Sequence, residues 1–340
     1  MKTPKVLVAL TEAEEADFLP PKIRARLEDL PIELHWIRTP LQAPEQWPEI
    51  LKSCSPDALI AAWSCPRLPD DLPVGGENDL KYLAYLAGSI RKAVPRELLV
   101  RGLLATNWGS SISRTISECG LLLILSAMRR ASYWSLAMHR DGGWKQGLQT
   151  VTQSLFEKRV GIHGFGQIAQ KLVPLLKPFD VEISTYSPSV PEELLAEMDV
   201  KRSPSLESLF ADNEVVVELA PYHEKNHHIV TEELLRSIPP GGVFVNIGRG
   251  AVVDEAALIR VAKERADDLQ VGLDVFEKEP LAVDSELRGL PNVALLPHIA
   301  GPTKDRRCDS TLLAIENLTR FARGEAVEDV VTPDIFDRST

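Results

Sequence analysis

The chain has 340 residues, 44% of them hydrophobic and 26% charged, with a formal net charge of −11 at pH 7. This length allows two domains, because a single hydrophobic core rarely grows beyond roughly 250 to 300 residues. The composition is typical of a soluble globular protein, and the negative charge argues against nucleic acid as the main partner, since phosphate binding requires a basic surface.

The cysteines and the N-terminal segment indicate the compartment. The four cysteines lack the spacing of metal ligands, so we expect free, buried thiols in a reducing environment: Cys54, Cys65, Cys119 and Cys308. The first apolar run, residues 6–10, is too short for a signal peptide, and no run approaches the ~18 apolar residues of a membrane-spanning helix. These features predict a cytoplasmic protein without a membrane partner.

The first third of the chain alternates short apolar runs with helical or turn-rich segments. The runs are residues 5–10, 32–37, 57–63, 81–87 and 103–107. Strands separated by helices predict a parallel sheet covered on both faces. A longer helical pattern then extends from residue 112 to about residue 140. It is typical of a buried core helix, and the alternative is a connecting helix that also lines a subunit interface.

The second part of the chain alternates in the same way, with apolar runs that are nearly continuous, as in central parallel strands. The runs are residues 160–162, 181–185, 214–219, 243–246, 271–275 and 293–296. Residues 304–323 have helical spacing, and we expect them to cross back onto the first domain and to leave a polar tail. The predicted fold class is α/β with two doubly wound parallel-sheet domains, residues 1–106 plus 302–340 and residues 107–301.

A loop with the pattern Gly164-x-Gly166-x-x-Ala169 lies between the first of these runs and a helical pattern. This is the order of a dinucleotide-binding βα turn. Gly164 permits the tight turn, Gly166 lets a pyrophosphate approach the backbone, and Ala169 keeps the helix close to the strand. Such a pattern also occurs by chance, so its weight depends on the residues that follow.

Charged side chains follow the later strands, and in open α/β sheets ligands bind beyond the carboxyl ends of the strands. Arg249 stands between Gly248 and Gly250 after the run at 243–246. It is either a solvated loop cation or, as we favour, a clamp for a carboxylate or a carbonyl group. His298 follows the last run, where a side chain that titrates near neutral pH is a candidate for proton transfer.

The remaining acids and histidines are less specific. The segment after residue 273 carries the acids Asp274, Glu277 and Glu279, of which at most two can be functional. Glu277 and its neighbour Lys278 are expected to be solvated surface charges. The histidines at positions 223, 227 and 228 are interpreted as surface residues, because no Asp or Cys has the spacing of a metal site with them. No metal is predicted.

Four motifs, in this order and spacing, resemble those of the D-isomer-specific 2-hydroxyacid dehydrogenases. They are Gly164-x-Gly166-x-x-Ala169, Asn246-x-x-Arg249-Gly250, Asp274-Val275-Phe276-x-x-Glu279-Pro280 and Pro297-His298-Ile299-Ala300-Gly301. The resemblance implies that Arg249 orients and polarises a 2-oxo acid, that His298 is the catalytic acid/base, and that Glu279 hydrogen-bonds this histidine. It also implies a flavodoxin-like substrate domain, a Rossmann domain, an active site in the cleft between them, and a homodimer formed through the nucleotide-binding domains.

The resemblance also assigns binding residues. The cofactor is NAD or NADP, and its expected contacts are Gly164, Phe165, Gly166, Gln167, Ile168, Ser187, Pro221, Ile247, Gly248, Arg249, Asp274 and His298. The small-molecule substrate is expected to contact Gly88, Ser89, Ile90, Arg249 and His298, with backbone amides of the first three holding its carboxylate.

Several positions depart from the family pattern. Ser187 replaces the acid that usually binds the ribose hydroxyls of NAD, which slightly favours NADP, although Arg202 would have to come from the next strand to bind a 2′-phosphate. Gln167 stands where a cation beside the pyrophosphate is common. Arg91, after the substrate loop, is either a surface charge or a selector of a second anionic group, and Trp63 is a candidate wall of the pocket.

These observations predict an NAD(P)-dependent reductase of a small 2-oxo acid, with glyoxylate or hydroxypyruvate as the first candidates. Within the same chemistry, the alternative is a dehydrogenase of another small anion, such as formate, phosphite or a phosphorylated hydroxy acid. The alternative from another class is a dinucleotide-sensing, corepressor-like binding protein. The complete set of Arg249, Glu279 and His298 argues against this last function.

Overall fold

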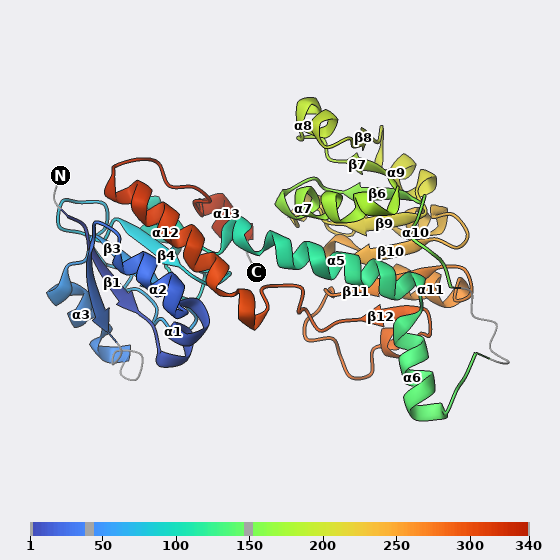
Figure 1. The fold of residues 1–340 in the computed structure, drawn as a ribbon, viewed down its shortest axis with the longest axis horizontal. Coiled ribbons are helices and arrows are strands. Elements are labelled where there is room, and N and C mark those ends of the chain that lie inside the picture. The colour runs from blue at the N-terminus through green and yellow to red at the C-terminus, as the bar shows by residue number, and fades with distance from the viewer. Residues whose placement is uncertain (1–2, 38–43, 146–151, 339–340) are drawn as a thin grey trace. The chain divides into compact units, whose positions relative to one another are not determined.

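The structure, a computed structural model, describes residues 3–37, 44–145 and 152–338 (Figure 1). It divides into two compact units, one formed by Met1–Ile112 with Thr303–Thr340 and the other by Ser113–Pro302. Each unit has its own parallel sheet and its own hydrophobic core. The first unit is discontinuous in sequence, because its last segment follows the whole of the second unit.

The sheet of the first unit has the strand order β2-β1-β3-β4-β5. Its strands are β1 (Lys5–Ala9), β2 (Glu33–Ile37), β3 (Ala58–Ala61), β4 (Tyr82–Tyr85) and β5 (Leu104–Thr106). All neighbouring strands are parallel, which requires a crossover connection between each strand and the next. This order is flavodoxin-like, and it confirms the predicted class of the first domain.

Helices cover both faces of this sheet. They are α1 (Glu12–Phe18), α2 (Pro21–Glu28), α3 (Trp47–Cys54), α4 (Arg96–Val100), α12 (Cys308–Ala322) and α13 (Pro333–Arg338), with 3-10 turns η1 (Pro44–Gln46), η2 (Gly109–Ile112) and η7 (Lys304–Arg306). On one face, Ile315 and Leu318 of α12 pack in the same cluster as Phe18, so this helix lies on the first unit as expected. The expectation of a polar tail is wrong for α13, because this helix buries Phe336 in the core of the other face.

The sheet of the second unit has the strand order β12-β11-β10-β9-β6-β7-β8 (Figure 1). Its strands are β6 (Arg159–His163), β7 (Glu182–Tyr186), β8 (Lys201–Arg202), β9 (Val215–Glu218), β10 (Val243–Asn246), β11 (Gln270–Leu273) and β12 (Val293–Leu295). The chain runs outward from the centre in both directions, so the topological switch point lies between β6 and β9. This order confirms the predicted Rossmann class; the sequence missed only β8, whose two polar residues form no apolar run.

Helices also cover both faces of the second sheet. They are α5 (Ser113–Met128), α6 (Ala131–Asp141), α7 (Gln167–Leu176), α8 (Glu192–Glu197), α9 (Leu206–Asp212), α10 (Glu232–Ser237) and α11 (Glu255–Glu264), with 3-10 turns η3 (Lys177–Phe179), η4 (Glu224–Asn226), η5 (Gly250–Val252) and η6 (Glu286–Gly289). Residues of α5 and α7 share one core cluster with the strands, and residues of α9, α10 and α11 share the other. The carboxyl ends of the strands are thereby held in fixed positions.

The prediction of one long helix from residue 112 to about residue 140 is wrong. The structure has two helices there, and Arg130 between them has a φ of 50°, in the left-handed region. The carbonyl oxygen of Met128 accepts a hydrogen bond from the backbone N–H of Gln153 (2.9 Å). This partner from a distant segment replaces the next bond of the helical ladder, so α5 ends there.

By length and composition alone, Gly109–Met128 is long and apolar enough to cross a membrane. In the structure, however, Leu123 and Ile124 of α5 are buried in the same cluster as Leu172 of α7. A helix whose apolar side is covered by strands and by a neighbouring helix is the core helix of a globular unit. This confirms the prediction of a core helix for α5; among the described residues of α6, only Ala137 is buried.

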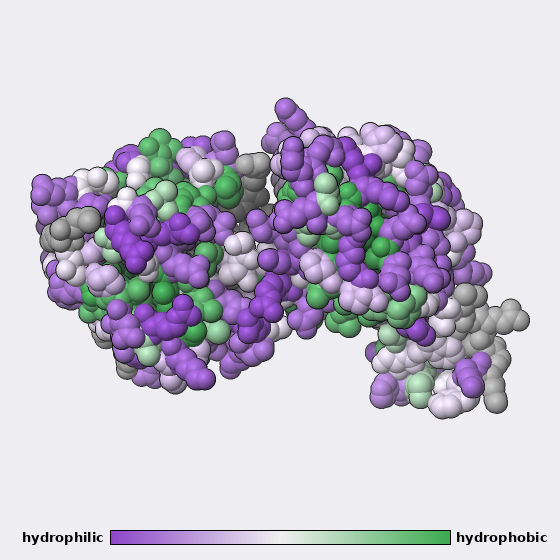
Figure 2. Space-filling model, turned by 45° about the horizontal axis from the view of Figure 1, so that its top comes forward, coloured by the Kyte–Doolittle hydropathy of each residue, from purple (hydrophilic) through white to green (hydrophobic). Residues whose placement is uncertain are grey.

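The surface and the cysteines fit the composition. The face visible in Figure 2 is mostly hydrophilic, with hydrophobic side chains in small patches.

All four cysteines are free thiols, as predicted, but they are only partly buried. Burial nevertheless raises the pKa of Cys65 to about 12, so this thiol is protonated and a poor nucleophile at neutral pH.

Candidate active site

The loop after β6 begins at Gly164, which packs closely against one neighbouring loop and forms a hydrogen bond to the end of β7. Gly164 has a φ of 86°, a conformation that glycine adopts without strain. A Cβ at this position would lie 2.8 Å from the Cα of Ala220 in the loop after β9, so any larger residue would displace that loop. The N–H of Gly164 also donates to the carbonyl oxygen of Tyr186 (3.0 Å). Both contacts hold the start of the turn in place.

The N-terminus of α7 offers open space for an anion. Gly166 is the N-cap residue, and none of the side chains that the structure describes caps the helix. A Cβ built on Gly166 meets nothing within 4 Å among the described residues. Unpaired N–H groups and the helix dipole favour a negative group at such a position. The loop therefore fits the pyrophosphate of a dinucleotide, and the predicted contacts Phe165, Gln167 and Ile168 adjoin it in the chain.

The loops after β9 and β10 meet beside the switch point. A Cβ on Gly248 would lie 3.2 Å from the carbonyl oxygen of Glu218, which shows how closely the two backbones pack. The buried Asn246 accepts the N–H of Gly248 (3.0 Å) and donates to the carbonyl oxygen of Arg249 (3.1 Å). The side chain of Ile247 is buried in the core. These bonds fix the backbone that carries Arg249.

The predicted contact Pro221 lies on the loop after β9. Its carbonyl oxygen accepts a hydrogen bond from the side-chain amide of Asn226 (2.7 Å), and this asparagine is buried. The same amide group accepts the N–H of His223 through its oxygen (2.8 Å). The turn at Pro221 is therefore braced from within the protein.

Ser187 follows β7, and Arg202 of β8 reaches back to it. The guanidinium of Arg202 donates to the carbonyl oxygens of Ser187 (2.9 Å) and Val190 (2.6 Å) and also pairs with Glu192. The sequence left open whether this arginine comes near Ser187. It does, although its charge already has an acidic partner.

His298 and Glu279 form a hydrogen-bonded pair on the segments after β12 and β11. Nδ1 of His298 lies 2.6 Å from Oε2 of Glu279, and Oε1 of Glu279 accepts the N–H of Phe276 (3.0 Å). The two side chains are 44% and 34% exposed. Because Nδ1 is occupied, Nε2 is the ring nitrogen left to exchange a proton with an external group. The pairing that the resemblance implied is present.

Asp274 fixes the segment that carries His298. Its carboxylate is buried and accepts the N–H groups of Ile299 (2.7 Å) and Ala300 (3.0 Å), one on each oxygen. Its own N–H donates to the carbonyl oxygen of Asn246 (3.0 Å). Sequence reasoning missed this positioning role. The cofactor contact assigned to Asp274 stays a prediction.

Arg249 follows β10, and its Nη1 donates to the carbonyl oxygen of Gly248 (2.7 Å). Desolvation by the surrounding protein lowers the pKa of Arg249 from its usual value, and the charge of Glu279 opposes this shift. The guanidinium is still a cation at neutral pH, because arginine does not deprotonate in proteins. Its remaining N–H donors suit a carbonyl or carboxylate oxygen.

A cavity of about 590 Å³ lies against the histidine and glutamate. It is lined by Phe276, Glu279, Pro280, Leu281, Arg288, Leu295, Leu296, Pro297 and His298. A concave, mostly apolar surface with a few polar groups is typical of a small-molecule site.

In the first unit, the predicted substrate loop Gly88, Ser89 and Ile90 follows β4. Ile90 is buried, and the carbonyl oxygen of Gly88 accepts a hydrogen bond from the side chain of Asn107 (2.9 Å). A Cβ on Gly88 would lie 2.4 Å from a ring carbon of Trp108. Glycine is required here because the indole packs against its Cα.

The two other candidates of the first unit have partners within that unit. The guanidinium of Arg91 lies over the ring of Phe336 (5.8 Å to the centroid). Trp63 packs against Phe18 (5.0 Å between centroids), and the guanidinium of Arg307 lies over its ring (4.9 Å). These contacts explain both side chains as parts of the surface of the first unit.

Sequence reasoning missed a second histidine–glutamate pair, His163 and Glu218. They are the last residues of β6 and β9 and are partners in the register of the sheet. Nδ1 of His163 lies 2.6 Å from Oε2 of Glu218, and Oε1 of Glu218 accepts the N–H of Ala220 (2.7 Å). Both side chains are buried. The pair lies at the switch point, directly before Gly164.

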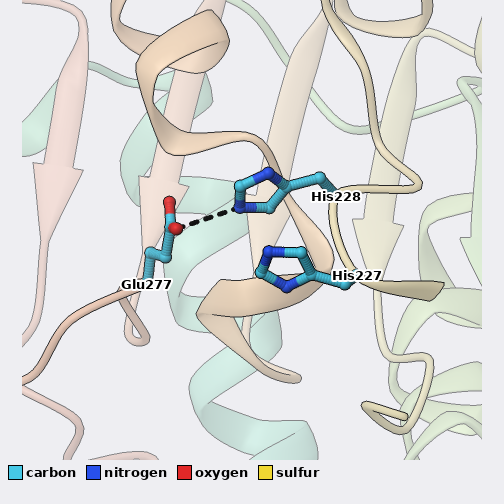
Figure 3. Close-up of side chains that lie close together, drawn as sticks. All are labelled: His227, His228 and Glu277. Carbon is cyan, nitrogen blue, oxygen red and sulfur yellow. Dashed lines mark ion pairs between the residues drawn. The ribbon is translucent and has the colours of Figure 1, made fainter. Parts of the chain in front are cut away.

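A third group of side chains converges in the second unit (Figure 3). His227, His228 and Glu277 each offer a ligand atom, and these atoms lie within 4.8 Å of one another. Nε2 of His228 is 3.0 Å from Oε1 of Glu277. The sequence analysis treated all three as separate surface residues. It could not detect the cluster, because their proximity depends on the fold and not on their spacing in the chain.

The two sheets and the open loop at the switch point are those of a dinucleotide-binding α/β protein, and the His298–Glu279 pair lies in the same unit. Residues 121–300 match the family described as D-isomer specific 2-hydroxyacid dehydrogenase, NAD binding domain. The chain is 32% identical over 270 residues to a glyoxylate reductase of Thermococcus litoralis. The aligned residues cover 76% of this chain and 79% of that relative. The chain is 32% identical over 239 residues to glyoxylate/hydroxypyruvate reductase B of Pectobacterium carotovorum, with 69% and 74% covered.

Among solved structures, the chain is similar to the PH0520 protein from Pyrococcus horikoshii OT3, with a TM-score of 0.71, 25% identity, and 99% and 97% of the two chains covered. The chain belongs to the D-isomer-specific 2-hydroxyacid dehydrogenase family. It is therefore an oxidoreductase that uses a nicotinamide dinucleotide, and the corepressor-like alternative is not favoured.

Proposed function

We propose that the protein reduces glyoxylate or hydroxypyruvate to the corresponding 2-hydroxy acid. The observation that carries this proposal is the exposed His298–Glu279 pair, whose carboxylate lies close enough to Arg249 to influence its pKa. A proton donor and a cation that stabilises charge on the oxygen are the groups that reduction of a carbonyl group requires. The two relatives named for these substrates supply the choice of 2-oxo acid.

The chain's own residues supply the acid–base and electrostatic parts of the reaction. A bound nicotinamide supplies the hydride for the carbonyl carbon. Nε2 of His298 donates a proton to the carbonyl oxygen, while Glu279 holds Nδ1 and so keeps the ring in one orientation. Arg249 stabilises the negative charge that develops on that oxygen, because its donors are fixed before the reaction begins.

We assign the binding residues as follows. Gly164, Phe165, Gly166, Gln167 and Ile168 hold the pyrophosphate, supported by the open N-terminus of α7. The further cofactor contacts are Ser187, Pro221, Ile247, Gly248, Arg249, Asp274 and His298. In the first unit, the backbone amides of Gly88, Ser89 and Ile90 are the proposed ligands of the substrate carboxylate.

We propose NADPH as the preferred reductant. Ser187 carries no charge to repel a 2′-phosphate, and the cation of Arg202 lies at its carbonyl oxygen. A phosphate would have to compete with Glu192 for this arginine, so we expect a preference and not an exclusion of NADH.

We further propose a cytoplasmic homodimer that associates through α5 and α6. Leu122 of α5 and Leu136 and Met138 of α6 are 56%, 49% and 52% exposed. Large apolar side chains that are exposed on two consecutive helices are candidates for a surface that a partner covers. Sedimentation at micromolar concentration should show a dimer, and a monomer would contradict this proposal.

A substrate panel tests the function. Oxidation of NADPH and NADH is followed with glyoxylate, hydroxypyruvate, pyruvate, phenylpyruvate and 2-oxoglutarate, with the His298→Asn variant as the control. We expect kcat/KM for glyoxylate or hydroxypyruvate to exceed that of the larger acids by about ten-fold or more. A separate assay with formate and NAD⁺ or NADP⁺ tests the alternative: formation of NADH or NADPH by both proteins, without reduction of any 2-oxo acid, would overturn the proposal.

A further inference from the structure

We propose that His227, His228 and Glu277 form a binding site for one divalent transition-metal ion of the zinc class. The site lies wholly within the second unit (Figure 3). It joins the segment before α10 to the segment that leads from β11 to Glu279. None of its three residues is among the proposed dinucleotide contacts.

The backbones that carry the three side chains are fixed in place. The N–H of His228 donates to the carbonyl oxygen of Ala251 (3.0 Å), and the N–H of Glu277 donates to Oε2 of Glu255 (3.0 Å). His228 has a φ of 54°, in a region that a non-glycine residue adopts only when its surroundings hold it there. The backbones of His228 and Glu277 are therefore held in place, and His227 is the ligand that has to move.

The distances are close to those that a metal ion requires. The potential ligand atoms lie within 4.8 Å of one another, and Nε2 of His228 is 3.0 Å from Oε1 of Glu277. Zinc binds histidine nitrogen and carboxylate oxygen at about 2.0–2.2 Å, so two ligand atoms of one ion lie at most about 4.3 Å apart. A rearrangement of the side chains has to close this difference.

A buried ring nitrogen of His228 that lacks a hydrogen-bond partner indicates a ligand. Nε2 of His228 is buried, and its approach to Glu277 lacks the geometry of a hydrogen bond, so it has no hydrogen-bond partner in the described part of the chain. Buried polar atoms normally have a partner. A metal ion that accepts the nitrogen lone pair would satisfy it and would also neutralise the carboxylate of Glu277.

His227 must turn for the ion to bind. Its ring is stacked on that of His228, with 3.8 Å between centroids and 22° between planes. Nearly parallel rings cannot both direct in-plane lone pairs at one ion. Because His227 is exposed, its ring is free to rotate, and metal binding should separate the stacked pair.

The ligand set selects the class of ion. Two imidazoles and one carboxylate suit Zn²⁺, Ni²⁺ and Cu²⁺, whereas Mg²⁺ and Ca²⁺ prefer oxygen ligands alone. Three protein ligands leave at least one coordination position for water.

A bound ion would stiffen two segments of the proposed active site. A Cβ on Gly250 would lie 1.8 Å from the backbone carbon of Phe276, so the backbones next to Arg249 and Glu277 are in direct contact. Glu279 follows two residues after Glu277. The ion would cross-link these segments to His227 and His228 without touching the acid–base pair.

The test uses the full-length protein without an affinity tag. Zn²⁺ binding is measured by competition with a chromogenic chelator and by calorimetry, with Mg²⁺ as the comparison ion. We expect one Zn²⁺ site whose affinity falls about ten-fold or more in His227→Gln and in Glu277→Gln. His139→Gln removes an exposed histidine of α6 and should leave the affinity unchanged. Circular dichroism checks that each variant is folded.

Nuclear magnetic resonance of the histidine rings provides a second readout. The signals of His227 and His228 should shift on addition of Zn²⁺, while that of His139 should not. Equal Zn²⁺ affinity in the wild type, His227→Gln and Glu277→Gln would overturn the site, as would Mg²⁺ binding as tight as that of Zn²⁺. Neither outcome depends on catalytic activity, so the test stands apart from the proposed function.

Discussion

Two histidine–glutamate pairs in the second unit share one bonding pattern and differ in burial. In both, Nδ1 of the histidine lies 2.6 Å from Oε2 of the glutamate: His298 with Glu279, and His163 with Glu218. In both, the other carboxylate oxygen accepts a backbone N–H. The side chains of the first pair are 44% and 34% exposed, whereas those of the second are 7% and 0% exposed.

This difference decides what each pair can do. A solvent-exposed ion pair contributes about 0–1 kcal/mol to stability, so the fold does not depend on His298 and Glu279, and they can exchange a proton with a ligand. Removing one partner of a buried pair costs about 3–5 kcal/mol, because the other is left without compensation. We therefore expect His163 and Glu218 to hold the loops of the switch point, with no part in proton transfer.

The largest effect is expected from removing the exposed histidine. His298→Asn deletes the proton donor, and asparagine tolerates the left-handed φ of 54° at this position. Steady-state kcat with the preferred 2-oxo acid should fall by about 10²–10⁴-fold. The dissociation constant of NADPH should change far less than kcat, because His298 is one of many proposed cofactor contacts, and the melting temperature should stay close to that of the wild type. Turnover near the wild-type rate would remove His298 from the mechanism.

The buried pair should behave in the opposite way. Glu218→Leu leaves His163 unpaired and should lower the free energy of unfolding by about 3–5 kcal/mol. The double variant His163→Ile/Glu218→Leu should recover at least half of this loss, because two apolar side chains need no partner, although the N–H of Ala220 still lacks its acceptor. Chemical denaturation measures both. Equal destabilisation of the single and double variants would show that the pairing is not what stabilises the switch point.

A smaller effect is expected at the ribose end of the proposed cofactor site. His163 is in register with Tyr186, which precedes Ser187, so the buried pair and this position belong to one edge of the sheet. Ser187→Asp places a negative charge beside the expected 2′-phosphate and should shift the ratio of kcat/KM from NADPH toward NADH by about 10–100-fold. Ser187→Asn, which adds size without charge, is the matched control. An unchanged ratio in Ser187→Asp would show that this position does not discriminate between the 2′-phosphate and the 2′-hydroxyl of the ribose.

Features that a local sequence pattern determines could be predicted from the sequence. Apart from β8, the strands of both sheets appear as apolar runs, and Gly164, Arg249, Glu279 and His298 stand out because each follows such a run. The Rossmann and flavodoxin-like classes follow from the alternation of these runs with helices, together with the family resemblance.

Features that depend on distant neighbours were not predictable in this way. The break at Arg130 results from a hydrogen bond between Met128 and Gln153. The His163–Glu218 pair exists because β6 lies beside β9, although β7 and β8 intervene in the chain. Arg202 reaches Ser187 only because β8 pairs with β7. In each case, the partner is selected by the fold.

The most direct test of this account makes the same substitution in both pairs. Glu279→Gln and Glu218→Gln each remove one charge and keep the size of the side chain. Single-turnover oxidation of NADPH and the dissociation constant of NADPH are measured for both variants. We predict that Glu279→Gln slows the single turnover with unchanged cofactor affinity, and that Glu218→Gln weakens cofactor binding with a near-normal rate at saturation. The same response in both variants would contradict the separation of catalysis from positioning.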